Sequence, residues 1–346
     1  MNTALAESWQ KLKKEAPNVR IRDAAASLGV SELELLATRI GTGVSPLKEN
    51  WTEFLIKCPS LGRVMALTRN DFCVHERKGS FEHVSVHGKM GLVTGPEIDL
   101  RIFLNQWRYG FFVEDTSEER ILYSVQFFDG SGEAVFKLYA TEESDLASFL
   151  RLKNDLQKLD GISQLNLEPK IKEQSPVKPQ LDKSTRVRFL ESWSNLKDTH
   201  DFFTLLNEFN VERMDALEIA NGRFTSPWEW KQFESLLKLC VKEGLEIMVF
   251  VGSKGVIQIH TGLVETLEER GPWFNILDKD FNLHLRKDFV SHIWFVNKPT
   301  LDGTVSSLEL FSENGELILQ CFGKRKPGQP QSKLWEKLID LCQPKD

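Results

Sequence analysis

The sequence predicts an α+β protein in which one module, made of N-terminal helices, a large antiparallel β-sheet and a closing helix, occurs twice as a tandem duplication. Three observations predict this class. Residues 62–79 align with residues 245–262, and residues 124–139 align with residues 307–322 at the same offset. Each copy passes from a helical pattern to alternating strands. A charged stretch with several prolines separates the copies. A constant offset over this distance indicates a duplicated domain.

The domain boundaries follow from the repeat and from the stretch between its copies. Toward the N-terminus the offset drifts by a few residues, as small loop insertions would cause, and Trp9 aligns with Trp193. Residues 166–187 contain three prolines and many charges without hydrophobic periodicity, which is typical of a linker. We therefore expect an N-terminal repeat over residues 1–165 and a C-terminal repeat over residues 188–346.

The helices near the start of each copy carry capping signals. In the first copy, Ser31 and Glu34 form a capping-box pattern. In the second copy, Ser226 followed by Pro227 predicts an N-cap and a proline at the first helical position. The helix after them is expected to run to about Lys242.

The strands of each copy are expected to form a sheet with one polar face. Residues 97–107 alternate with the period of a half-buried strand. One face would carry Ile98, Leu100, Ile102 and Leu104, and the other Asp99, Arg101, Phe103 and Asn105. Residues 312–315 form a hairpin turn signal between two strand-like runs. Helices followed by a strand meander are typical of an antiparallel sheet, whose polar face is free to line a pocket.

Composition and charge argue against several classes of function. Hydrophobic residues make up 41% and charged residues 27% of the chain, as in a globular protein. The formal net charge of −6 gives no electrostatic support for binding nucleic acid or a membrane surface. The N-terminus lacks a signal-peptide core, and no apolar run approaches the roughly 18 residues of a membrane span. We expect no nucleic-acid partner and no stable membrane association.

Cysteines and histidines give little support for a structural metal. The five cysteines are scattered and form no CxxC motif, so we expect reduced, buried thiols. His83 and His87 have the spacing of zinc ligands on a helix, but they lie in an alternating, strand-like stretch. At about 3.3 Å per residue, they would lie about 13 Å apart, which is too far to share one ion.

Residues 22–36 have the alanine-rich helix, glycine turn and serine-capped second helix of a DNA-binding motif. The second helix starts with Glu32 and Glu34, however, and carboxylates there would repel phosphates. A helical hairpin packed on its own domain is the preferred interpretation. The sequence also lacks glycine-rich phosphate loops and the GxSxG nucleophile motif. Any chemistry is therefore expected to belong to a bound cofactor.

His200 is the residue that most suggests a site. It follows Asp198 and Thr199, either of which suits the N-cap of a helix. The apolar face of that helix would carry Phe202, Leu205, Leu206 and Phe209. In the first turn the helix dipole disfavours a charged imidazolium, and neutral imidazole is the form that binds iron. A lone histidine is nevertheless more often a surface or structural residue, so both interpretations stand at this point.

The stretch WSNLKDTHDFFTLL, residues 193–206, resembles the helix that bears the proximal histidine in the HemS/ChuS/PhuS family of bacterial cytoplasmic haemin-degrading and haemin-transport proteins. The resemblance covers nearly the whole chain, including the duplication. Other family-like stretches are RDAAASLGVSELEL, DLRIFLNQW, EIMVFVGSKGVIQIHTG, KPTLDGTVSSLELF and QCFGKRKPGQP. The resemblance implies a cytoplasmic protein that binds haem b (iron protoporphyrin IX).

The resemblance also implies roles for individual residues. His200 would be the proximal iron ligand, and Arg101 the distal residue, with Phe103 beside it. The propionates or neighbouring waters would be held by Arg213, Lys298, Gln320 and Arg325. Arginine and lysine suit carboxylates because they donate charge-assisted hydrogen bonds. Taken singly, each of these basic residues is more often a solvated surface charge.

The sequence departs from the family pattern at Phe322, a position in the cofactor-binding set where tyrosine is usual and where the first repeat has Tyr139. The hydroxyl near the propionates is lost there. His200 has no histidine counterpart in the first repeat, and Arg101 corresponds to His284 in the second. We therefore expect one haem per chain, with the first repeat supplying Arg101.

Two functions are compatible with the resemblance. One is an enzyme that opens the porphyrin ring oxidatively at a meso carbon and releases iron, with electrons from a donor and with Arg101 as an electrostatic stabiliser. The other is a chaperone that delivers haem to a separate haem oxygenase. Both need the same ligand set, and we favour the enzyme. A DNA-binding regulator is disfavoured by the acidic helix at Glu32.

Overall fold

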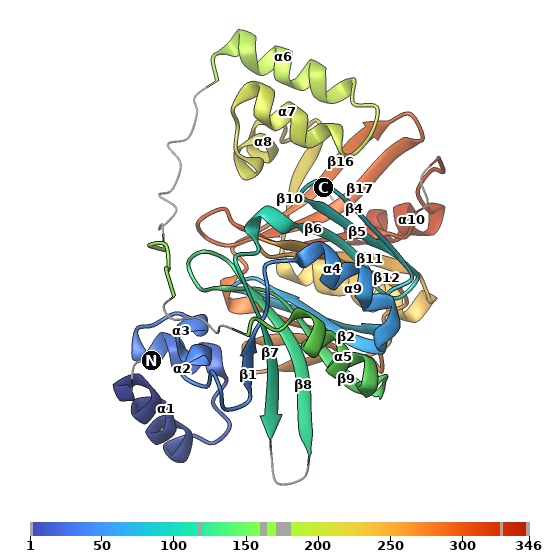
Figure 1. The fold of residues 1–346 in the computed structure, drawn as a ribbon. Coiled ribbons are helices and arrows are strands. Elements are labelled where there is room, and N and C mark those ends of the chain that lie inside the picture. The colour runs from blue at the N-terminus through green and yellow to red at the C-terminus, as the bar shows by residue number, and fades with distance from the viewer. Residues whose placement is uncertain (1–2, 117–119, 160–164, 171–180, 326–327, 344–346) are drawn as a thin grey trace. The chain divides into compact units, whose positions relative to one another are not determined.

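The computed structural model describes residues 3–116, 120–159, 165–170, 181–325 and 328–343 (Figure 1). The chain divides into two compact units. Unit 1 comprises residues 1–69, 75–171 and 252–258, and unit 2 comprises residues 70–74, 172–251 and 259–346. Each unit therefore includes a short segment from the other repeat. Residues 171–180 of the predicted linker lie outside the described residues, and the predicted domain boundaries remain predictions.

The N-terminal repeat contains five α-helices and nine strands in its described part. The helices are α1 (Thr3–Glu15), α2 (Ile21–Leu28), α3 (Glu32–Ala37), α4 (Trp51–Lys57) and α5 (Leu146–Leu156). The strands are β1 (Val44–Pro46), β2 (Gly62–Arg69), β3 (Cys73–Gly79), β4 (His83–His87), β5 (Met90–Thr94), β6 (Asp99–Phe103), β7 (Tyr109–Thr116), β8 (Ile121–Phe128) and β9 (Ala134–Ser144). Short 3₁₀ helices lie at Cys58–Leu61 and Leu104–Gln106.

The C-terminal repeat has the same order of α-helices and strands. Its helices are α6 (Lys183–Ser194), α7 (Asp201–Phe209), α8 (Arg213–Ile219), α9 (Trp230–Glu243) and α10 (Lys333–Cys342). Its strands are β10 (Thr225–Trp228), β11 (Ile247–Gly252), β12 (Val256–Gly262), β13 (Leu267–Arg270), β14 (Trp273–Leu277), β15 (Phe281–Arg286), β16 (His292–Thr300), β17 (Gly303–Phe311) and β18 (Leu317–Gly323). A 3₁₀ helix lies at Lys287–Phe289. The predicted tandem α+β duplication is confirmed.

The two repeats also share strand pairing in detail. In unit 1, antiparallel pairs run in the order β1-β7-β8-β9-β2, and β5 pairs with both β4 and β6. In unit 2, the corresponding orders are β10-β16-β17-β18-β11 and β13-β14-β15. The register between β8 and β9 shifts at Phe127/Phe128, and that between β17 and β18 shifts at Leu310/Phe311. These two shifts lie at the repeat offset of 183 read from the sequence.

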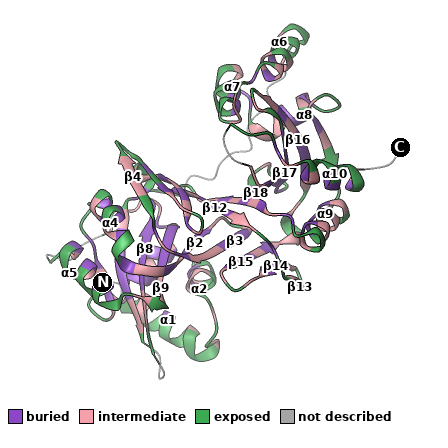
Figure 2. Ribbon diagram, turned by 90° about the vertical axis from the view of Figure 1, so that its right-hand side faces the viewer, coloured by how far each residue is buried: buried purple, intermediate pink, exposed green. Residues whose placement is uncertain are grey.

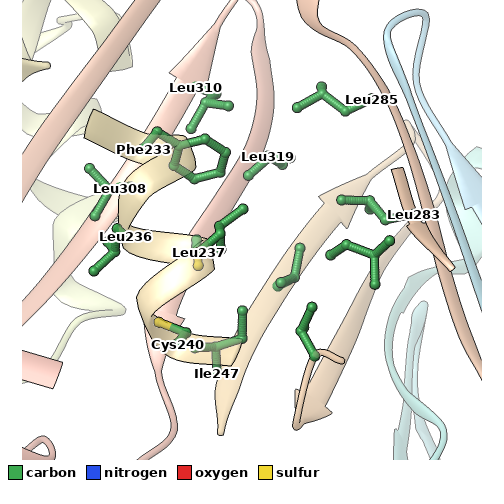
Figure 3. Close-up of a cluster of buried hydrophobic side chains, with 14 of the residues drawn as sticks. Phe233, Leu236, Leu237, Cys240, Ile247, Leu283, Leu285, Leu308, Leu310 and Leu319 are labelled. Carbon is green, nitrogen blue, oxygen red and sulfur yellow. The ribbon is translucent and has the colours of Figure 1, made fainter. Parts of the chain in front are cut away.

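In unit 2, helices cover both faces of the sheet formed by β10, β16, β17, β18 and β11. Successive side chains of β17 point to opposite faces of this sheet and therefore contact different helices. On one face, Phe233 and Leu236 of α9 pack with Leu308 and Leu310 of β17 (Figure 3). On the other face, aromatic residues of α6 and α7 pack with Phe311. The side chain of residue 309 therefore points to the face that α6, α7 and α8 cover. Figure 2 shows the buried residues concentrated along the strands.

Several local predictions are confirmed. Ser31 and Glu34 form a capping box at the start of α3, and Gly29 ends α2 with φ of 69°, so residues 22–36 form a helical hairpin. Leu100 and Ile102 of β6 are buried, and so is Ile98 just before the strand, as the alternation predicts. All five cysteines are buried and unpaired. Apart from these confirmed predictions, the structure shows no helix among the described residues that is both long and apolar enough to cross a membrane.

Other local predictions are wrong by a few residues. Ser226 and Pro227 lie in strand β10, and α9 starts at Trp230 after a capping box at Glu229, because pairing of β10 with β16 engages this segment. Leu104 and Asn105 lie in a 3₁₀ turn, so β6 ends two residues earlier than the alternation suggests. Helix α6 begins inside the predicted linker, because Asp182 accepts a hydrogen bond from the amide of Thr185 and caps the helix. Glu32, in the helical hairpin that was correctly predicted, is buried and forms ion pairs with Arg69 and Lys137.

Candidate functional site

His200 lies in unit 2 at the N-terminus of α7. The helix begins at Asp201, so His200 itself is the N-cap residue and makes no capping bond with its side chain. The prediction of Asp198 or Thr199 as the N-cap is therefore wrong. The reason is a 3₁₀-type turn before the helix, in which the amides of Asp201 and Phe202 donate to carbonyls three residues earlier. The predicted apolar face of α7 is buried.

The imidazole of His200 is oriented by Asp198. Its side chain is 92% exposed, and Nδ1 lies 2.5 Å from Oδ1 of Asp198. The backbone amide of His200 also donates to this carboxylate, over 2.8 Å, and is the largest cause that holds the pKa of Asp198 below its ordinary value. An ionised Asp198 accepts a hydrogen bond from Nδ1–H, which leaves the lone pair of Nε2 available. In many metal sites, the histidine ligand donates its other ring N–H to a carboxylate, which holds the imidazole in one orientation.

The turn that connects β16 to β17 lies beside this segment. The amide of Leu301 donates to the carbonyl of Lys197 over 3.0 Å. Asp302, in the same turn, lies 4.0 Å from Nη2 of Arg325, and the Arg325 charge also lowers the pKa of Asp198. Nη1 of Arg325 is buried and has no hydrogen-bond acceptor among the described residues. A buried guanidinium N–H without an acceptor is suited to donate a hydrogen bond to an anionic group of a ligand.

Three residues predicted to hold propionates converge on Glu309, which is fully buried. Arg213 donates to both carboxylate oxygens, over 2.6 Å from Nε and 2.9 Å from Nη2. Lys298 and Gln320 each donate to Oε1 over 2.9 Å. Gln320 lies opposite Glu309 across the β17–β18 pair, and Lys298 is on the neighbouring strand β16. The sheet register therefore assembles the cluster from three adjacent strands.

This cluster carries more positive than negative charge. Burial alone raises the pKa of Glu309, but Arg213 and Lys298 outweigh it and hold the pKa well below its ordinary range, so the group is a carboxylate. Two cations then share one carboxylate. Both cations lie over the ring of Phe202, at 5.2 Å for Arg213 and 4.7 Å for Lys298. Phe202 lies on α7, two residues after His200, so this ring connects the Glu309 cluster to the segment that carries the histidine.

Phe322 lies outside this hydrogen-bond cluster. Its ring centroid is 5.1 Å from that of Phe250 on β11, and the side chain is half-buried. Its cross-strand partner on β17 is Ser307. The position keeps an aromatic packing role without the hydroxyl that the family pattern places there.

Arg101 and Phe103 lie on β6 in unit 1, on the face opposite Leu100 and Ile102, as predicted. Arg101 donates to the carboxylate of Asp99, two residues earlier on the same face. Burial, the largest influence, raises the pKa of Asp99, although Arg101 opposes the shift. Arg101 remains about a third exposed, at 35% of its side chain. Its guanidinium is therefore within reach of solvent and of a ligand.

Sequence reasoning missed Glu309. Its strand β17 is buried on both faces over most of its length, and a carboxylate in such a strand needs cations from elsewhere. The signal was present in the run VSSLELF, where a single acidic residue occurs in a strand that is otherwise uncharged. The partners could not be assigned locally, because Arg213 is almost a hundred residues away in the sequence.

Comparisons with known proteins identify the family. The model of the haemin-degrading HemS.ChuX domain matches residues 29–156 and 210–341, once in each repeat. The hemin transport protein HmuS of Yersinia pestis is 34% identical over 98% of this chain and 97% of its own length. The holo form of the heme-binding protein PhuS from Pseudomonas aeruginosa superposes with a TM-score of 0.93 at 41% identity, covering 97% of both chains. ChuS, an Escherichia coli heme oxygenase, superposes with a TM-score of 0.88 at 32% identity, covering 99% of this chain and 100% of its own.

These matches place the chain among tandem-repeat proteins that handle haem. It belongs to the HemS/ChuS/PhuS family. The predicted family membership and fold class are both confirmed. The descriptions of the relatives differ, since they name hemin transport, heme binding and heme oxygenase activity.

Proposed function

We propose that this chain binds haem b through His200 in the cytoplasm and opens the ring oxidatively, so that the iron can be used. The observation that carries the proposal is the exposed imidazole whose Nδ1 is held by Asp198. This arrangement leaves Nε2 as the ligand atom and supplies a second residue that increases its basicity.

The charges around His200 suit the two carboxylates of haem. The Glu309 cluster has one positive charge more than it has negative charges. Arg213, whose side chain is 26% exposed, is the cation of the cluster that a ligand can reach. Lys298 is only 3% exposed, so in this arrangement it acts through Glu309. Arg325 contributes a buried N–H without an acceptor in the described part of the chain. We propose one propionate at Arg213 and the other at Arg325.

For the distal side of the haem we propose Arg101, with Phe103 as an apolar neighbour. Haem is the substrate and supplies the redox chemistry of ring opening, with electrons from an external donor. The chain's own residues would orient the ring and stabilise negative charge, and a guanidinium is suited to the second task. Asp99 would keep Arg101 on the open face of β6.

The alternative is a carrier that passes intact haem to a separate haem oxygenase. The hemin transport description of HmuS favours it, whereas the heme oxygenase description of ChuS favours the enzyme. The two functions require the same ligands and differ in what happens after reduction. Reconstitution with haemin, followed by a reductant in the presence of catalase, distinguishes them. The enzyme predicts loss of the Soret band with release of a bilin and iron, and a stable reduced haem that transfers intact would contradict it.

A further inference from the structure

Unit 1 contains a cavity of about 670 Å³ that the proposed haem site does not use. Its apolar lining comes from α1, α2, α3 and β8, with Trp9, Ile21, Leu36 and Leu122. A volume of this size lies in the range of small-molecule binding pockets. The lining also contains two polar side chains that are more than nine-tenths buried, Lys137 at 6% and Gln126 at 4% exposure.

The repeat places this cavity at the position that the Glu309 cluster occupies in unit 2. At the repeat offset, the lining residues Asp115, Gln126, Lys137 and Tyr139 align with Lys298, Glu309, Gln320 and Phe322. Three of these four strand positions carry polar side chains in both units, with different residue types, and the fourth has Tyr139 in unit 1 and Phe322 in unit 2. Both repeats therefore have polar side chains at this place in the sheet, but their different residue types suit different ligands.

Buried charges beside the cavity favour an anion. Glu32 is an ion-pair partner of both Lys137 and Arg69. Burial raises the pKa of Glu32, but the two cations outweigh burial and lower it, so two cations share one carboxylate. This is the charge balance of the Glu309 cluster in unit 2. Among the described residues, the cavity lining has four cationic side chains and two carboxylates.

Tyr139 gives the cavity a hydrogen-bond donor. Its hydroxyl makes no hydrogen bond with the described residues, although the side chain lines the cavity. Burial is the main cause that raises its pKa, so the group stays a neutral phenol and disfavours iron ligation as a phenolate. The lining contains no histidine, cysteine or methionine. A ligand would therefore be held by charge, hydrogen bonds and apolar contact, without a metal bond.

We propose that the cavity in unit 1 is a second binding site, for an aromatic or otherwise apolar molecule that carries a carboxylate or an equivalent anionic group. Lys137 and Tyr139 bind the anionic group, and the walls at Trp9 and Leu36 contact the apolar part. The site is independent of iron and of His200. It gives the first repeat a ligand of its own, whereas the second repeat carries the proximal haem ligand.

Anilinonaphthalene sulfonate is a suitable probe, because phenylnaphthylamine has the same rings without the anionic group. Calorimetric titration of the full chain, with and without one equivalent of haemin, is expected to show one sulfonate site that persists when haemin is present. The uncharged analogue is expected to bind about tenfold more weakly, and Lys137→Met to weaken sulfonate binding by about tenfold or more. Haemin binding is expected to be unchanged in this variant.

Tyr139→Phe is the sharper variant, because it removes only a hydroxyl without a described partner, so the fold is retained. It is expected to weaken sulfonate binding several-fold, while Tyr123→Phe on β8, which does not line the cavity, has no effect. Equal binding of the sulfonate by wild type, Lys137→Met and Tyr139→Phe would overturn the proposal. Equal binding of the charged and uncharged probes, or loss of sulfonate binding once haemin is added, would also overturn it. None of these outcomes depends on whether His200 binds haem.

Discussion

Replacing Glu309 by glutamine tests whether the buried cluster is held together by charge. The substitution keeps the size of the side chain and one acceptor oxygen, but it leaves the buried Lys298 and the partly buried Arg213 without a carboxylate. Four hydrogen bonds of 2.6–2.9 Å now reach this carboxylate. Removing one partner from a buried, hydrogen-bonded charge pair typically costs 3–5 kcal/mol. We expect the free energy of unfolding to fall by about that amount.

Urea unfolding of the full chain measures this loss, and Glu246→Gln is the matched control. Glu246 pairs with Lys324 in the same unit, but its side chain is 45% exposed. An exposed ion pair is worth about 0–1 kcal/mol, so the control is expected to lose little. Because a propionate would restore a negative charge to the cluster, haem is expected to stabilise Glu309→Gln more than it stabilises the wild type. A loss for Glu309→Gln no larger than for Glu246→Gln would refute the reasoning.

Three further outcomes follow from the same structure. Asp198→Asn keeps the shape beside His200 but removes the charge, and we expect about 10- to 100-fold weaker haem binding in a spectroscopic titration; unchanged affinity would contradict the orienting role. Arg325→Met is expected to weaken binding of haem but not of its dimethyl ester, and an equal effect on both would exclude a propionate contact. The depressed pKa of Glu309 contributes stability that is complete above its ordinary value of 4.5 and is lost as pH falls toward the lower folded value. Acid titration of urea midpoints is therefore expected to show a steeper loss below pH 4.5 in the wild type than in Glu309→Gln, and parallel curves would contradict it.

Much of the fold could be predicted because its signals are local or repeated. The period-2 pattern around Leu100 and Ile102 fixes the buried face of β6, and the pair Ser31 and Glu34 fixes the start of α3. The helix start near Ser226 was missed because strand pairing, a non-local interaction, overrides a capping signal. The start of this helix therefore could not be placed from its local sequence.

The site was predicted in part for the same reason. His200 lies at a helix N-terminus that the sequence marks by its polar residues and its apolar face. Glu309 was missed because its meaning depends on Arg213 from another helix and on Lys298 from another strand. The sequence around Glu309 does not show that three residues predicted to hold a propionate donate hydrogen bonds to this carboxylate. Partners in a buried network are a property of the tertiary fold.

The central claim is that the imidazole of His200 is the iron ligand. The most direct test is the ferric absorption spectrum of the haemin complex of His200→Ala, compared with wild type and with His292→Ala, a histidine on β16 in the same unit. We expect a shifted Soret band and weaker binding for His200→Ala, restored in part by added imidazole, and a wild-type spectrum for His292→Ala. A wild-type spectrum and affinity for His200→Ala would contradict the assignment.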